Sequence, residues 1–180
     1  MKSKKLLFLV AGLLIPAFQS IAQDSGRHAL IAYFSATGTT AHAAEKLAEA
    51  TGGELYAITP AKAYSDADLD WRNKQSRSSV EMKDPKSRPA IKDRKKDLSG
   101  YDTIFIGYPI WWNLAPRVIN TFIESNDLKG KTVIPFATSG GSTIGNSAAE
   151  LKKSYPSLDW KAGIMLNSID KETLAKLKKF

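Results

Sequence analysis

Apolar and polar residues follow two different patterns along this chain. Continuous apolar runs of strand length predict β-strands that are covered on both faces. Between these runs, apolar residues recur three or four positions apart, which predicts helices that pack on the strands. The runs predict strands over 29–34, 54–58, 103–107, 131–137 and 160–166. The helical spacing predicts helices over 40–51, from Ala115 onward, over 146–155 and over 170–180.

A regular alternation of strands and helices is typical of an α/β fold. Such strands form a parallel sheet with right-handed crossovers, and the helices cover both of its faces. We therefore expect a three-layer sandwich around a five-stranded parallel sheet. Residues 60–98 interrupt the alternation because they have no clean periodicity, and we expect an irregular excursion there with one short helix near 66–75. An excursion of that length indicates a functional segment or an element that the pattern misses.

The first residues of the chain have the pattern of a secretory signal. Three lysines lie within the first five positions, an apolar stretch follows over 6–18, and Ser20 and Ala22 place small residues before a cleavage point. The apolar stretch is shorter than the roughly 20 residues that a membrane-spanning helix needs. We therefore expect residues 1–22 to be a signal peptide and residues 23–180 to form one domain, exported to a bacterial periplasm. An uncleaved membrane anchor and a core helix are the alternatives.

The composition narrows the possible chemistry and partners. The chain has no cysteine, which excludes disulfides, thiol chemistry and a lipidated cysteine. The net charge is +8, or +5 without the three leading lysines, and Lys62–Lys96 holds eleven Lys or Arg against six Asp or Glu. A basic domain can bind nucleic acid. This segment lacks regularly interleaved aromatic residues, however, so we interpret it as a solvated basic face, a lid and a docking surface, and we expect no nucleic-acid partner.

Small hydroxyl residues and a glycine form the loop between the first strand and its helix. The loop has the sequence SATGTT and contains no charged residue. Its N–H groups and hydroxyls, together with the N-terminus of the following helix, suit a phosphate group. It lacks the further glycines of a dinucleotide fingerprint and the Gly-Lys-Ser/Thr of a nucleoside triphosphatase. An ordinary N-capping turn is the structural alternative, because Ser and Thr favour helix starts.

Two more loops of unusual composition follow the strands over 103–107 and 131–137. The loop YPIWWN carries two adjacent tryptophans, which suit a flat aromatic ligand or seal the core; one ring can point inward while the other meets a ligand. The loop TSGGSTIG combines glycines, which allow close backbone approach, with hydroxyls that can bond a ring edge. Because the carboxyl ends of parallel strands share one edge of the sheet, we expect all three loops to lie together there.

These loops contain almost no reactive side chains. No G-x-S-x-G elbow surrounds Ser139 or Ser142, His28 precedes a strand at the opposite edge, and His42 is expected to be solvated. No group of His, Asp and Glu has metal-ligand spacing, so we expect neither a catalytic residue nor a metal. A site that binds a phosphorylated planar molecule without reactive groups is typical of a cofactor that brings its own chemistry. Flavin mononucleotide (FMN) fits this description.

The three motifs, in this order, resemble those of the flavodoxin-like superfamily. The likeness is greatest to a family of short bacterial flavodoxins with YPIWW and TSGGS loops, and it extends over about residues 29–166. The resemblance implies a flavodoxin-like sheet in the order 2-1-3-4-5, a fold that is itself a known example of ligand binding at the carboxyl edge. It also implies an FMN site. The implied phosphate ligands are Ser35, Thr37, Gly38, Thr39 and Thr40, and the implied ring contacts are Pro109, Ile110, Trp111, Trp112, Asn113, Thr138, Ser139, Gly140, Gly141 and Ser142.

The chain departs from that family in three respects. Flavodoxins that carry electrons are typically acidic and cytoplasmic, whereas this chain is basic and carries an export signal. Thr143 stands where the TSGGS loop is expected to have a glycine.

Three functions are compatible with the motifs. The first is electron transfer to a redox partner protein through a non-covalent flavin. The second is an FMN-dependent NAD(P)H:quinone-type oxidoreductase with a small-molecule electron acceptor, and the third is a flavin-binding module without turnover. The sequence shows no nicotinamide site, and a periplasm contains little NAD(P)H, so the first function is favoured.

Overall fold

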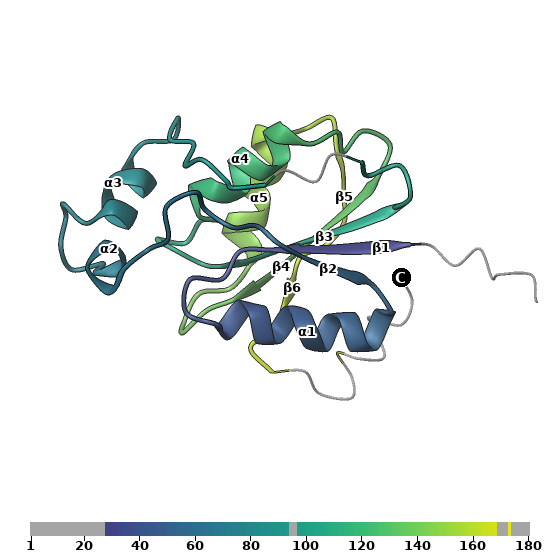
Figure 1. Cartoon of the computed structure of the whole chain (residues 1–180), viewed down its shortest axis with the longest axis horizontal. Helices are drawn as coiled ribbons and strands as arrows, with labels where there is room; N and C mark the ends of the chain where they lie inside the picture. Colours follow the sequence, from purple (N-terminus) through teal and green to yellow (C-terminus); the bar gives the residue numbers. More distant parts are fainter. Residues whose placement is uncertain (1–27, 94–96, 169–172, 174–180) are drawn as a thin grey trace, which may run out of the picture.

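The fold is built around a parallel sheet. The computed structural model describes residues 28–93, 97–168 and 173. Its strands are β1 (Ala29–Tyr33), β2 (Glu54–Ala57), β3 (Thr103–Pro109), β4 (Thr132–Thr138), β5 (Asp159–Trp160) and β6 (Ile164–Met165). The order is β2-β1-β3-β4-β5, with β6 also paired to β4, and every pair is parallel (Figure 1). The α/β class and the strand order 2-1-3-4-5 are therefore confirmed.

Helices cover both faces of this sheet. They are α1 (Thr39–Thr51), α2 (Asp66–Leu69), α3 (Arg77–Lys83), α4 (Arg117–Ser125) and α5 (Gly145–Ser154). Helix α1 packs on one face, and α4 and α5 pack on the other, which confirms the three-layer arrangement (Figure 1). The expected helix over 170–180 lies outside the described residues apart from Thr173, and the expected signal peptide over 1–22 lies wholly outside them. No helix of the described part is long and apolar enough to cross a membrane.

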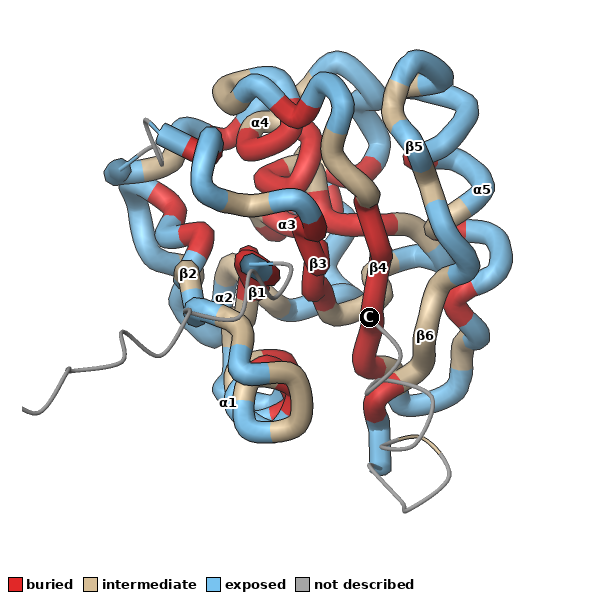
Figure 2. Tube along the Cα trace, turned by 90° about the vertical axis from the view of Figure 1, so that its right-hand side faces the viewer, coloured by how far each residue is buried: buried red, intermediate tan, exposed pale blue. Residues whose placement is uncertain are grey.

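The central strands form the core. Phe105 of β3 lies opposite Ile31 of β1 and Ile134 of β4, and all three side chains are fully buried. Successive residues of each strand point to opposite faces, so alternate residues join the cluster under α1 or the cluster under α4 and α5. Figure 2 shows the buried residues following β1, β3 and β4. This burial on both faces explains why continuous apolar runs marked these strands in the sequence.

The last strand differs from the prediction. The run over 160–166 forms two short strands, β5 and β6, rather than one. Trp160 pairs with Val133, and Ile164 pairs with Phe136. The segment from Trp160 to Ile164 is therefore one residue longer than the part of β4 that it lies beside, as in a β-bulge. On the side of β4 that faces β5 and β6, the Val133 carbonyl accepts from the Lys161 N–H. Two residues further along β4 is Pro135, which has no N–H to donate, so the ladder is interrupted there.

The excursion also differs, because it contains two short helices rather than one. Its ends pair with each other: Ala61 N–H donates to the Ala90 carbonyl at 2.7 Å, and Lys92 N–H donates to the Thr59 carbonyl at 2.8 Å. The expected helix over 66–75 stops at Leu69 because side chains compete for the following backbone. The carboxylate of Asp70 accepts from the Arg72 N–H, and the amide of Asn73 accepts from the Gln75 N–H. A second helix, α3, then begins after Ser76, which caps it.

Candidate functional site

The three loops singled out in the sequence meet at one cleft. It has a volume of about 520 Å³ and lies at the carboxyl edge of the sheet. Its lining residues are Ala36, Thr37, Thr39, Thr40, Pro109, Ile110, Trp111, Thr138, Ser139, Gly140 and Asn167. All of them except Ala36 and Asn167 are among the predicted site residues. None of them is charged, so a ligand in this cleft would be held by backbone groups, hydroxyls and apolar contact.

The remaining predicted residues lie around this cleft rather than in its lining. Ser35 and Gly38 line a neighbouring hollow, and Trp112 lines another. Asn113, Gly141 and Ser142 line neither the cleft nor these hollows.

The loop before α1 leaves the start of that helix open. Gly38 is the N-cap residue with a left-handed φ of 94°, a conformation that glycine adopts readily, and its N–H donates to Ser35 Oγ at 3.1 Å. No side chain caps α1, and its first turn contains no acidic residue. Thr37, Gly38 and Thr39 are exposed. The hydroxyls therefore do not form an ordinary N-cap, and the exposed residues at the start of α1 leave room for an anion beside the positive end of the helix dipole.

Thr40 has a different environment from the other threonines of this loop. Its hydroxyl lies 2.9 Å from that of Thr138, at the end of β4, and both residues are buried. The hydrogen bond joins the start of α1, directly after the SATGTT loop, to the end of β4. Thr40 therefore positions two walls of the cleft relative to each other.

Asn167 and Ala36 are the two lining residues that sequence reasoning missed, and Asn167 has hydrogen bonds to the loop after β4. Its amide oxygen accepts from the Ser139 N–H at 2.8 Å, and its amide nitrogen donates to the Ser139 carbonyl at 2.7 Å. Ser139 Oγ in turn accepts from the N–H groups of Gly141 and Ser142. Asn167 thus fixes the loop after β4 from outside. The available signal was its place: it follows the last strand of a parallel sheet and so lies at the same edge as the other loops.

The tryptophan loop ends in a tight turn. Trp111 and Leu114 exchange backbone hydrogen bonds of 3.0 and 2.9 Å, and the residues between them, Trp112 and Asn113, both have positive φ, at 47° and 62°. This is the pattern of a type I′ turn. Asparagine accepts that conformation readily and tryptophan does not. Asn146 secures the turn by donating to the Asn113 carbonyl at 2.9 Å.

The turn sends its two indoles to different environments. Trp111 is half-buried and packs edge-on against Phe34 at 5.6 Å and Tyr64 at 5.3 Å between ring centres. Trp112 is 47% exposed. Trp111 packs on the core while it lines the cleft, whereas Trp112 is exposed and does not line the cleft, so the expected placement of one ring toward a ligand stays a prediction.

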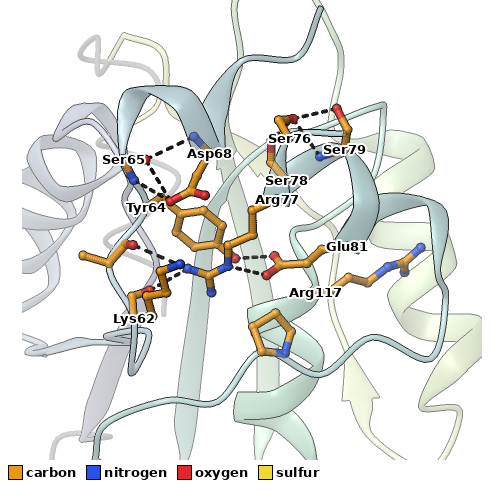
Figure 3. A network of polar contacts seen from close by, with 12 residues as sticks. Lys62, Tyr64, Ser65, Asp68, Ser76, Arg77, Ser78, Ser79, Glu81 and Arg117 are labelled. Carbon is orange, nitrogen blue, oxygen red and sulfur yellow. Dashed lines mark hydrogen bonds and ion pairs between the residues drawn. The ribbon is translucent and has the colours of Figure 1, made fainter. Parts of the chain in front are cut away.

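A polar network fixes the excursion beside this wall (Figure 3). Tyr64 Oη donates to Glu81 Oε2 at 2.5 Å, and Arg77 Nε donates to Glu81 Oε1 at 2.7 Å. The Arg77 guanidinium also lies over the Tyr64 ring, 4.0 Å from its centre. Burial, together with the hydrogen bond to Glu81, raises the pKa of Tyr64 well above its usual range. Because Tyr64 packs on Trp111, this network connects α3 to the cleft wall.

The described part of the chain offers no cluster of metal ligands, and neither histidine lines the cleft. It contains no group of three or more His, Cys, Asp and Glu side chains that could hold a metal ion. The His42 side chain is 69% exposed beside Glu45, as expected of a solvated histidine. His28 is exposed at the start of β1, at the edge opposite the cleft.

The comparison with known families decides the relationship. A family model described as flavodoxin matches residues 28–179. The chain belongs to this flavodoxin family. No curated protein matches the chain significantly in sequence.

Solved structures agree with this family assignment. A provisionally assigned flavoprotein from Bacteroides eggerthii DSM 20697 is 66% identical, with a TM-score of 0.81 over 83% of this chain and 94% of that one. A second, from Bacteroides uniformis ATCC 8492, is 59% identical, with a TM-score of 0.82 over 86% and 99%. A Lactobacillus acidophilus flavoprotein, crystallised in complex with FMN, is 25% identical, with a TM-score of 0.65 over 77% and 92%.

Proposed function

We propose that this flavodoxin-family protein binds FMN without a covalent bond and transfers electrons through it. The observation that carries the proposal is the meeting of three loops in one uncharged cleft beside the uncapped N-terminus of α1. The first-turn N–H groups and the positive end of the helix dipole favour a phosphate. The FMN complex of the Lactobacillus acidophilus flavoprotein supports this ligand.

The residues present fit the two ends of the nucleotide. The exposed Thr37, Gly38 and Thr39 would hold the phosphate. Trp111 and the backbone of Ser139 and Gly140 would hold the flavin ring. FMN supplies the acceptance and release of electrons, and the chain supplies binding, orientation and shelter from water.

Two kinds of electron acceptor remain candidates. The cleft lining contains no ionisable side chain that could exchange protons with a bound substrate, which supports a carrier that meets a redox partner protein. A specific observation favours a small-molecule oxidoreductase as the second candidate. A hollow of about 410 Å³ shares Thr37, Ile110 and Trp111 with the cleft and has room for a small substrate.

We further propose that the protein is exported and works in a bacterial periplasm. The support is the leader pattern of residues 1–22. Mass spectrometry of the protein isolated from its host tests this directly. A mature N-terminus at Gln23 is expected, and a chain that retains the leader in the cytoplasm would contradict it.

Titration with two flavins tests the proposed cofactor. FMN is expected to bind with a change in flavin fluorescence, and riboflavin, which lacks the phosphate, is expected to bind at least about tenfold more weakly. No binding of FMN would contradict the function, and equal binding of both flavins would contradict the phosphate assignment. Oxidation of NADH or NADPH by the FMN-loaded protein with a quinone acceptor then separates the candidates. Turnover supports the oxidoreductase and excludes a pure carrier.

A further inference from the structure

Two exposed indoles form a wall beside the cleft. Trp71, from the turn after α2, is 66% exposed, and Trp112 is 47% exposed. Only two other large hydrophobic side chains of the described residues are exposed, Leu55 and Val80. Both tryptophans line the hollow of about 410 Å³ next to the cleft, and both line a second hollow of about 580 Å³. Large apolar side chains that gather at exposed hollows indicate a binding surface.

The first hollow is continuous with the cleft. Ala36, Thr37, Pro109, Ile110 and Trp111 line both. A molecule in this hollow would therefore lie directly beside the occupant of the cleft. Both hollows have the volume of sites for small molecules rather than of flat protein interfaces.

The second hollow is positively charged. Arg72, Lys74 and Lys83 line it together with the two indoles, and no carboxylate does. The Arg72 guanidinium lies 5.0 Å from the centre of the Trp71 ring. None of the three cations has a carboxylate of the described residues within ion-pair distance. Aromatic faces next to unpaired cations are complementary to an aromatic molecule that carries a negative charge.

The wall is held in place by ordered contacts. Arg77 and Glu81 of α3 pair with only 18% and 13% of their side chains exposed, and Tyr64 bonds to the same carboxylate (Figure 3). Ser65 and Asp68 form a capping box at the start of α2, just before Trp71. On the other side, Trp112 is held in a left-handed conformation that a tryptophan rarely adopts, and such strain is concentrated at binding sites. Ordered contacts therefore hold both the Trp71 side and the Trp112 side of the hollows in place.

We propose that these two hollows form a binding site for a planar aromatic anion, a molecule of fused rings with a carboxylate or sulfonate group. Its rings lie against Trp71 and Trp112, and its anionic group lies near Lys74 and Lys83. The site deepens the proposed function and rests on it in one respect, that the neighbouring cleft holds FMN. It thereby names the class of small molecule that meets the flavin.

Anthraquinone-2-sulfonate is a suitable probe, titrated calorimetrically into the purified protein with and without saturating FMN. We expect one molecule per chain to bind in both cases, with a dissociation constant of the order of tens of micromolar for a ligand of this size. The neutral 2-(hydroxymethyl)anthraquinone and the non-planar cyclohexanesulfonate are each expected to bind about tenfold more weakly, because each lacks one of the two recognised features.

Variants locate the probe. Trp71→Ala is expected to weaken binding about tenfold through loss of a stacking face, and Lys83→Glu about threefold to tenfold, with a smaller dependence on salt. Val80→Ala and Lys86→Glu are matched controls, because both residues are exposed in the same segment and line neither hollow. All four variants are expected to keep the wild-type affinity for FMN. Trp71 and Lys83 act independently, so either result tests the site if the other variant folds poorly.

Four outcomes would overturn the assignment. They are the absence of saturable binding, an unchanged affinity in whichever of Trp71→Ala and Lys83→Glu fold as the wild type does, displacement of the probe by FMN, and equal losses in Lys86→Glu and Lys83→Glu. The third result would place the probe in the cleft, and the fourth would indicate a broad basic face for an acidic protein. Binding of the probe in a protein that does not bind FMN would leave this site standing and contradict the proposed function alone.

Discussion

The hydroxyl oxygens of Thr40 and Thr138 lie 2.9 Å apart, although the two residues are 98 positions apart in the chain. Thr40 is the second residue of α1, and Thr138 is the last residue of β4. The two residues are only 1% and 3% exposed, so water does not compete for this hydrogen bond. One hydrogen bond therefore sets the distance between two walls of the cleft.

Removing either hydroxyl of this pair should destabilise the protein. Thr40→Val and Thr138→Val are each expected to lower the free energy of unfolding by about 1–3 kcal/mol, because each leaves one buried hydroxyl without a partner. The double variant should lose less than the sum, because no unpaired hydroxyl remains. Urea unfolding of the four proteins measures this cycle. Strictly additive losses would show that the two hydroxyls do not interact.

A negative charge in the loop before α1 should abolish FMN binding. In Thr37→Glu and Thr39→Glu the new carboxylate would repel the phosphate and fill the space at the helix N-terminus, where both residues are exposed. Flavin fluorescence titration is the measurement. Gln75→Glu, an exposed position that lines neither the cleft nor its neighbouring hollows, is the matched control and should bind FMN as the wild type does. Unchanged affinity in both threonine variants would refute the phosphate assignment.

The sequence was informative where local chemistry determined structure. The strands that form the core are buried on both faces, so their continuous apolar runs identified them. Small hydroxyl residues and glycines after two of them, and two adjacent tryptophans after a third, identified the loops of the cleft. The split between β5 and β6 escaped prediction because Pro135, on a different strand, interrupts their ladder. A pattern within residues 160–166 contains no information about that neighbour.

Long-range contacts account for the parts of the site that the sequence did not reveal. Asn167 is a single amide in a polar stretch, and its role follows only from its position opposite Ser139. The excursion gave no sign that Tyr64 would pack on Trp111 or that Trp71 would share a hollow with Trp112. Ser65 and Ser76 cap the two helices of the excursion and were local signals of where the helices begin. These signals were missed because the hydrophobic periodicity of the segment is weak.

Asn167 should affect flavin binding more than stability. Asn167→Ala removes both hydrogen bonds to the Ser139 backbone and frees the loop after β4, so FMN affinity is expected to fall about tenfold. Asn167→Asp keeps an acceptor for the Ser139 N–H but places a charge beside the Ser139 carbonyl, and it should bind FMN no better than Asn167→Ala. Asn73→Ala serves as the control, because the Asn73 amide oxygen accepts from the Gln75 N–H within the excursion. Equal FMN affinities in all these proteins would remove the positioning role of Asn167.

Alkaline pH should destabilise the protein through Tyr108. Burial raises the pKa of this tyrosine to about 12 in the folded protein, while its hydrogen bond with Ser147 acts in the opposite direction. Between pH 10 and about 12 the unfolded chain has released the proton that the folded protein keeps, so the free energy of unfolding falls as the pH rises. The contribution of Tyr108 to this loss is about 2–3 kcal/mol. Urea unfolding at pH 8 and pH 12 should therefore show a smaller loss in Tyr108→Phe than in the wild type, and equal losses would contradict the role of Tyr108.

Gly107 should not tolerate a methyl group. A Cβ atom at this position would lie 2.1 Å from Cζ of Phe136, its partner residue on β4. Phe136 is fully buried between the sheet and α1, so its ring cannot move aside without disturbing the core. Gly107→Ala is expected to lower the free energy of unfolding by about 1–3 kcal/mol, measured by urea unfolding. Gly100→Ala, where a Cβ would meet no atom within 4 Å, should remain within about 0.5 kcal/mol of the wild type. A stability of Gly107→Ala equal to that of Gly100→Ala would show that Phe136 has more freedom than its packing indicates.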